Sequence, residues 1–355
     1  MSRLITSLCA ACAAVAIAVP TAADAAEDWA NSLYTEGGIE LRADERVFTL
    51  FAVLNEMGLD EAPVARKNPI PKREYDAVRQ LVRDAVNLDP ALRAKFDEFF
   101  DKNPLPLRAY TAYALTLGSA PGFQAPEKPA KELAQLAGFE KLLAEFYAKH
   151  GIKKIFDHVQ PQHREALKRY QKVVDGPIAK AREILKAPET DDSPRIVVVL
   201  NLLDGRGAGY GVGDADVTYL VIGPDDAAEP NPMPIAKAFA RVELQAAAEA
   251  GNGALKNGAT LLEEVVAAGY AVGAANVADY VAETLARTVA IKAAVANGEV
   301  SRAFEAEKRN GFVLVSEMNR GLAIFAGSPK PMKVFLADFL REVDTSRYIA
   351  ALRGN

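Results

Sequence analysis

Residues 195–222 read RIVVVLNLLDGRGAGYGVGDADVTYLVI, and this stretch decides the fold class. Two runs of mostly β-branched residues, 196–200 and 217–222, flank a segment in which glycine occupies every second position from Gly205 to Gly213. Such runs predict strands, and we expect them to form a small antiparallel sheet joined by a glycine-rich connection. The glycine spacing fits neither common phosphate-binding motif, so we prefer a flexible loop or a sheet edge close to another backbone over a phosphate cradle.

The sequence on both sides of this stretch predicts helices. Apolar residues recur at helical spacing in segments 46–57, 71–85, 90–100, 107–117, 131–149, 161–186, 234–250, 260–268, 276–296, 299–309, 312–326 and 331–343. The predicted class is therefore α+β and mostly helical. We divide the chain into a signal peptide (1–25), an N-terminal helical region (26–118), a linker or surface loop (119–131), and an α+β region (132–355).

The N-terminal residues predict export from the cytoplasm. Arg3 precedes an apolar run over 4–19, and Ala23-Asp24-Ala25 provides the small residues that signal peptidase recognises. We expect cleavage after Ala25 and a periplasmic or secreted mature protein. An uncleaved membrane anchor is the alternative, but the apolar run is shorter than the ~20 residues that span a bilayer.

Composition excludes several classes of function for the mature chain. Both cysteines, Cys9 and Cys12, lie in the predicted signal peptide, so we expect neither a disulfide nor a thiol nucleophile. The net charge is −5 without a basic cluster, which argues against nucleic acid as a partner. No mature segment has the length and apolarity of a membrane span.

Three histidines are the imidazoles available for catalysis or metal binding. His150, His158 and His163 are separated by eight and five residues, whereas ligands on one helix face stand three or four residues apart. We therefore expect all three on the surface or in loops, and no metal site. The chain also has neither a GxSxG nor an H-E-x-x-H motif.

Several short motifs occur in an order that is informative about family. They are DERVF at 44–48, FDH at 156–158, VVLNLL at 198–203, YVAE at 280–283 and NGF at 310–312. This order resembles uncharacterised secreted bacterial proteins related to the gluzincin, or thermolysin-like, zinc peptidases. The resemblance implies a gluzincin-like core, in which the helix over 234–250 corresponds to the zinc-binding helix.

The zinc-binding residues of that family are missing from this helix. Aligned by motif order, Val242 and Ala246 stand at the two histidine positions, Glu243 at the general base and Glu283 at the glutamate ligand. The apolar stripe over 235–246 also predicts a packing surface there. The resemblance implies that Glu243 and Glu283 are remnants on neighbouring helices, with Val242 and Ala246 between them, facing the second helix. Glu243 as an ordinary solvated residue is the alternative.

These observations predict a peptidase-like protein that has lost its zinc and needs no cofactor. We expect it to be non-catalytic, as a scaffold or as a binding protein for a peptide or protein partner. One alternative is an active metal-dependent hydrolase with ligands not recognisable from the sequence. Another is a structural envelope protein in which the ancestral cleft is filled.

Overall fold

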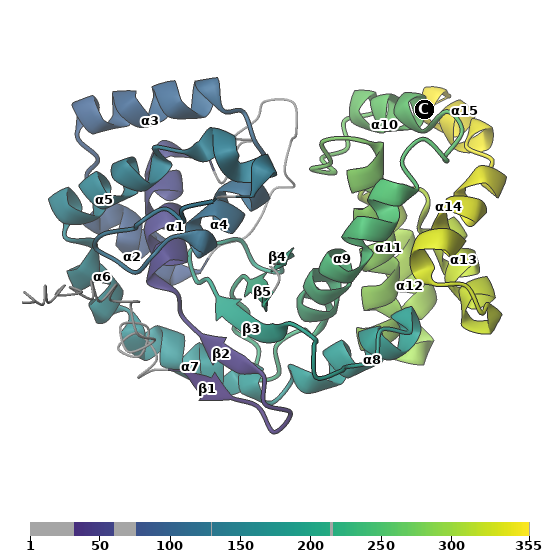
Figure 1. The fold of residues 1–355 in the computed structure, drawn as a ribbon, viewed down its shortest axis with the longest axis horizontal. Coiled ribbons are helices and arrows are strands. Elements are labelled where there is room, and N and C mark those ends of the chain that lie inside the picture. The colour runs from purple at the N-terminus through teal and green to yellow at the C-terminus, as the bar shows by residue number, and fades with distance from the viewer. Residues whose placement is uncertain (1–31, 60–75, 129, 214–215, 355) are drawn as a thin grey trace, which may run out of the picture. The chain divides into compact units, whose positions relative to one another are not determined.

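The fold is α+β and mostly helical, as predicted (Figure 1). The computed structural model describes residues 32–59, 76–128, 130–213 and 216–354. The chain divides into a first unit, residues 1–30, and a second, residues 31–355, which is described below. The predicted signal peptide and its cleavage site lie outside the described residues.

Most predicted helices are present, but the segment predicted over 161–186 forms two helices and the one predicted over 131–149 begins at Phe139. Residues 71–75 of the helix predicted over 71–85 lie outside the described residues. The helices are α1 (Glu45–Met57), α2 (Ala77–Ala85), α3 (Pro90–Lys102), α4 (Leu107–Thr116), α5 (Phe139–His150), α6 (Ile152–His158), α7 (Gln160–Gln171), α8 (Asp175–Leu185), α9 (Met233–Ala250), α10 (Gly258–Ala267), α11 (Val277–Ala294), α12 (Val300–Arg309), α13 (Val315–Gly327), α14 (Met332–Glu342) and α15 (Ser346–Arg353), with 3-10 turns at Lys131–Leu136 and Asn297–Glu299. Local signals set several ends: Asp89 caps the first turn of α3, and Gly58 ends α1 in a left-handed conformation.

The sheet is mixed and not purely antiparallel. Its strands are β1 (Leu33–Tyr34), β2 (Glu40–Arg42), β3 (Arg195–Leu200), β4 (Gly209–Gly213) and β5 (Val217–Ile222), in the order β1-β2-β3-β5-β4. Strands β2, β3 and β5 run parallel, and only the outer pairs β1–β2 and β4–β5 are antiparallel. The antiparallel prediction for β3 and β5 is wrong. The connection between them forms β4, which pairs antiparallel with the side of β5 away from β3. The chain therefore reverses direction twice, and β3 and β5 run parallel.

The alternating glycines bring β4 close to helix α9. A Cβ atom added at Gly209 would lie 2.6 Å from the carbonyl oxygen of Pro234, and one at Gly211 would overlap the carbonyl oxygen of Ala238. One at Gly213 would lie 2.8 Å from a methyl group of Val242. This confirms the expectation of a sheet edge that approaches another backbone, since a larger side chain would push the helix away.

The strands come from both sides of the predicted linker. Strand β2 belongs to the N-terminal region and pairs with β3 of the C-terminal region. Within the predicted linker, Phe123 is fully buried and its ring lies 5.5 Å from that of Tyr147. The segment therefore contributes to the core that connects the two regions.

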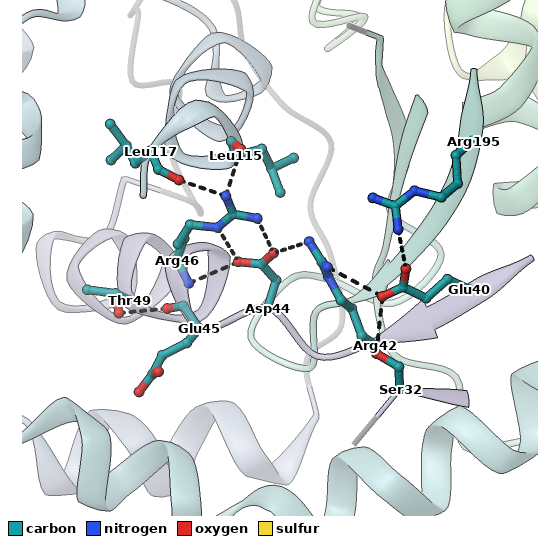
Figure 2. Close-up of polar contacts among 10 residues, drawn as sticks. All are labelled: Ser32, Glu40, Arg42, Asp44, Glu45, Arg46, Thr49, Leu115, Leu117 and Arg195. Carbon is teal, nitrogen blue, oxygen red and sulfur yellow. Dashed lines mark hydrogen bonds and ion pairs between the residues drawn. The ribbon is translucent and has the colours of Figure 1, made fainter. Parts of the chain in front are cut away.

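A charged network joins β2 to the helices that follow it (Figure 2). The carboxylate of Asp44 accepts hydrogen bonds from Arg42 (3.0 Å) and from the side chain and backbone of Arg46. Arg46 also donates to the carbonyl oxygens of Leu115 and Leu117, both at 2.8 Å, at the end of α4. Burial alone would raise the pKa of Asp44, but the two guanidinium groups hold it well below its usual range.

Candidate functional site

Helices α9 and α11 pack directly against each other, as the prediction for Glu243 and Glu283 required. The predicted orientation of α9 is nevertheless wrong. Val242 contacts Gly211 and Gly213 of β4, and Ala246 is exposed to solvent. Val242 therefore faces the sheet edge and not α11, because the glycines of β4 leave room for it.

The face of α9 that meets α11 carries cations. The Lys237 ammonium lies 3.8 Å from one carboxylate oxygen of Glu283, and the Arg241 Nε lies 3.8 Å from the other. Arg287, one turn after Glu283 on α11, adds an ion pair at 3.0 Å. Burial alone would raise the pKa of Glu283, but the surrounding cations lower it to about 2. The carboxylate is thus ionised and held among positive charges.

The network extends to neighbouring helices through Asp279 and Glu307. Asp279, one turn before Glu283, forms an ion pair with Arg241, whose side chain is only 3% exposed. Arg108 of α4 lies 3.4 Å from the same carboxylate. Arg287 pairs with Glu307 of α12 at 2.8 Å, and its guanidinium stacks on the Phe312 ring at 3.9 Å. Each cation of this network therefore has an acidic partner.

Glu243 and Glu283 do not share a site. Glu243 comes two residues after Arg241, which turns it by about 200° around the helix. It lies beside Leu185 of α8 and Phe325 of α13, in a pocket that does not include Glu283. Burial raises the pKa of Glu243, while nearby Arg182 partly opposes the increase.

The cations of the α9–α11 network cannot serve as metal ligands. Lysine ammonium and arginine guanidinium groups have no lone pair to donate, whereas zinc ligands are imidazole, thiolate or carboxylate groups. Across the part of the chain that the structure describes, no group of three or more His, Cys, Asp and Glu side chains is placed to hold a metal ion. What this arrangement does is neutralise the buried carboxylates and hold α9 against α11.

The three histidines are not part of this network of ion pairs. His163 is buried at 1% exposure beside the rings of Phe48 and Phe156, with Nδ1 3.1 Å from the carbonyl oxygen of Val159. Burial lowers its pKa to about 4. The surface prediction was wrong for His163, which takes a core position on the apolar face of α7. His158 is exposed, and His150 is partly buried at the end of α5.

Sequence reasoning identified Glu283 but missed the charged residues around it. Lys237 and Arg241 are four residues apart, as are Asp279, Glu283 and Arg287. Residues at this spacing share one helix face, so complementary charges on two helices were a usable signal. The apolar stripe of α9 attracted attention instead, although its spacing does not reveal which neighbour it meets.

Among the described residues, no helix is long and apolar enough to cross a membrane. Comparisons of the chain with protein-family models, curated proteins and solved structures found no match.

Proposed function

We propose that this chain is an exported, peptidase-like protein in which ion pairs occupy the place of a catalytic zinc. Its role is then non-catalytic, as a scaffold or in binding a peptide or protein partner. One observation carries the proposal: Lys237 and Arg241, one turn apart on α9, both face the carboxylate of Glu283 on α11.

The spacing matches that of a gluzincin zinc site. Such sites use two histidines one turn apart on one helix, with a glutamate ligand from elsewhere. In this register Lys237 and Arg241 replace the histidines, and Glu283 keeps the position of the third ligand. This match supports placing the two histidine positions five residues earlier than the alignment based on motif order, which placed them at Val242 and Ala246.

The same register also removes the general base. The residue after Lys237 is Ala238, which is buried against β4 beside Gly211. A gluzincin has a glutamate at this position to deprotonate the zinc-bound water. Without the ion and the base, nothing at this face generates a nucleophile from water. We therefore propose that hydrolysis has been lost together with the metal.

Elemental analysis and a peptidase assay on the purified mature protein test this function. We expect no stoichiometric zinc and no hydrolysis that a chelator abolishes. One equivalent of zinc together with chelator-sensitive cleavage would contradict the proposal. That result would favour an active hydrolase with other ligands.

A further inference from the structure

Helix α7 presents a stripe of cations to solvent, which we call the α7 stripe. Its members Arg164, Lys168 and Lys172 are exposed and follow one another at intervals of four residues, so they share one helix face. Within the described residues, none of the three side chains has a hydrogen bond or an ion pair. The sequence shows no basic run here, because the winding of the helix brings these charges together.

The α7 stripe differs from the other charged helix faces of the chain. Elsewhere a cation commonly stands one turn from an acidic residue, as in the ion pair of Lys153 with Asp157 on α6. On α7 the same spacing places like charges side by side, which destabilises a helix. Glu165, the one acidic residue of α7, pairs with no cation in the described structure. The helix dipole favours cations only in the last turn, so it does not account for Arg164.

An exposed tyrosine lies next to the α7 stripe. Tyr34 of β1 is 54% exposed, and its carbonyl oxygen accepts a hydrogen bond from the side chain of Gln171, which directly precedes the last cation of the stripe. Asp175, at the start of α8, accepts hydrogen bonds from the Thr35 hydroxyl (2.6 Å) and the Gly37 backbone (3.1 Å). These bonds fasten the β1–β2 hairpin to the end of α7. The ring and the cations therefore occupy adjacent parts of one surface.

We propose that this surface docks the protein on an anionic lipid bilayer. Lipid phosphates would supply the negative charges that the chain does not provide to the α7 stripe. Segment 152–172 contains six Lys and Arg residues against two Asp and Glu residues, whereas the whole chain has a net charge of −5. The field of the bilayer would therefore attract this side and repel the rest, which sets the orientation.

The aromatic side chain favours a bilayer over an acidic protein as the partner. A tyrosine ring with its hydroxyl suits the boundary between headgroups and hydrocarbon, where one end is apolar and the other is wet. Lipids also move laterally, so they can gather under charges that a helix holds one turn apart without a complementary pocket. The proposal adds a docking surface to the function proposed above and does not depend on the loss of the zinc site.

Co-sedimentation of the purified mature protein with vesicles tests the proposal. The vesicles contain phosphatidylcholine alone or phosphatidylcholine with phosphatidylglycerol. We expect binding only to the anionic vesicles, and weaker binding as salt is added. R164Q/K168Q/K172Q should bind about a hundredfold more weakly, since each charge near an anionic surface contributes about fivefold. Tyr34→Ser should lose less affinity, mainly at high salt where the electrostatic part is screened.

A second triple variant, K256Q/K292Q/K333Q, is the matched control. It removes three exposed lysines that lie on different elements and have no acidic partner among the residues described. The change in net charge is the same, and we expect this variant to retain most of its affinity. Equal losses in the two triple variants would show that net charge alone decides, and would overturn the proposal. Absence of binding to anionic vesicles at low salt, or equal binding to phosphatidylcholine alone, would also overturn it.

Thermal unfolding separates docking from a role in the fold. Removing like charges one turn apart should leave the melting temperature of R164Q/K168Q/K172Q unchanged or raise it. Lost vesicle binding with unchanged or higher stability supports docking by the α7 stripe. Lost binding together with lower stability would assign these cations to the fold and contradict the proposal.

Discussion

Asp44 and Glu283 are both surrounded by cations, but the two sites use different kinds of contact. Asp44 accepts short hydrogen bonds from two arginines and from the backbone at the start of α1. Glu283 has one ion pair at 3.0 Å and two contacts at 3.8 Å. The Asp44 network therefore fixes the junction between β2, α1 and the end of α4 through directional hydrogen bonds. The Glu283 network neutralises a buried charge, mostly through longer contacts. We therefore expect the Glu283 network to tolerate exchange of its cations better than the Asp44 network.

Removing Arg46 should produce the largest effect. Arg46→Met leaves the buried Asp44 carboxylate and the carbonyl oxygens of Leu115 and Leu117 without their main partner. We expect a loss of about 3–5 kcal/mol in the free energy of unfolding, measured by denaturant titration. Arg195→Met is the control, because Arg195 is half exposed and pairs with Glu40 at the network's outer end. It should lose less than about 1 kcal/mol. Equal losses would show that the two ends of the network are equivalent.

His163 gives the region around α1 a pH dependence of its own. Its folded pKa of about 4 lies below the ordinary value of 6.5, so the unfolded chain binds the proton more tightly. Stability should therefore fall as pH decreases from 6.5 to 4, by about 3 kcal/mol. His163→Phe should flatten the unfolding free energy over this window. A variant that keeps the full slope would contradict the assignment to His163.

Glu283 should act in a more acidic window. Its folded pKa of about 2 lies below the ordinary 4.5, so its contribution is present above pH 4.5 and is lost as pH falls toward 2. Because its side chain is 22% exposed, we expect about 2 kcal/mol. The difference in unfolding free energy between the unmutated protein and E283Q should be largest above pH 4.5 and shrink below it. A difference that does not change with pH would show that the ion pairs contribute nothing.

Local chemistry made much of the fold predictable. Asp89-Pro90 specified the start of α3, and the β-branched runs specified β3 and β5. The direction of β5 was not predictable, because the glycine-rich connection reads as a loop. It is in fact strand β4, which makes β5 run parallel to β3. A larger side chain at Gly211 would overlap the backbone of α9, and the sequence does not show this contact.

The site was predictable only in part, for a related reason. The sequence identified α9 and α11 as the helices of interest and Glu283 as a residue facing α9. It could not determine which residues of α9 face Glu283, since an apolar helix face through Val242 can pack against a strand as well as against another helix. The same limit applies to His163, whose burial depends on Phe48 from a distant segment.

Zinc titration of two double variants tests the central claim most directly. If the α9–α11 face keeps the geometry of a zinc site, K237H/R241H should bind about one zinc per chain through the two imidazoles and Glu283. V242H/A246H also introduces two histidines one turn apart, but they face β4 and solvent, so it should bind none. Zinc at 100 times its dissociation constant should stabilise the first variant by about 2.7 kcal/mol, or restore its folding, and a chelator should reverse this. Zinc binding by V242H/A246H instead, or by neither variant, would contradict the account.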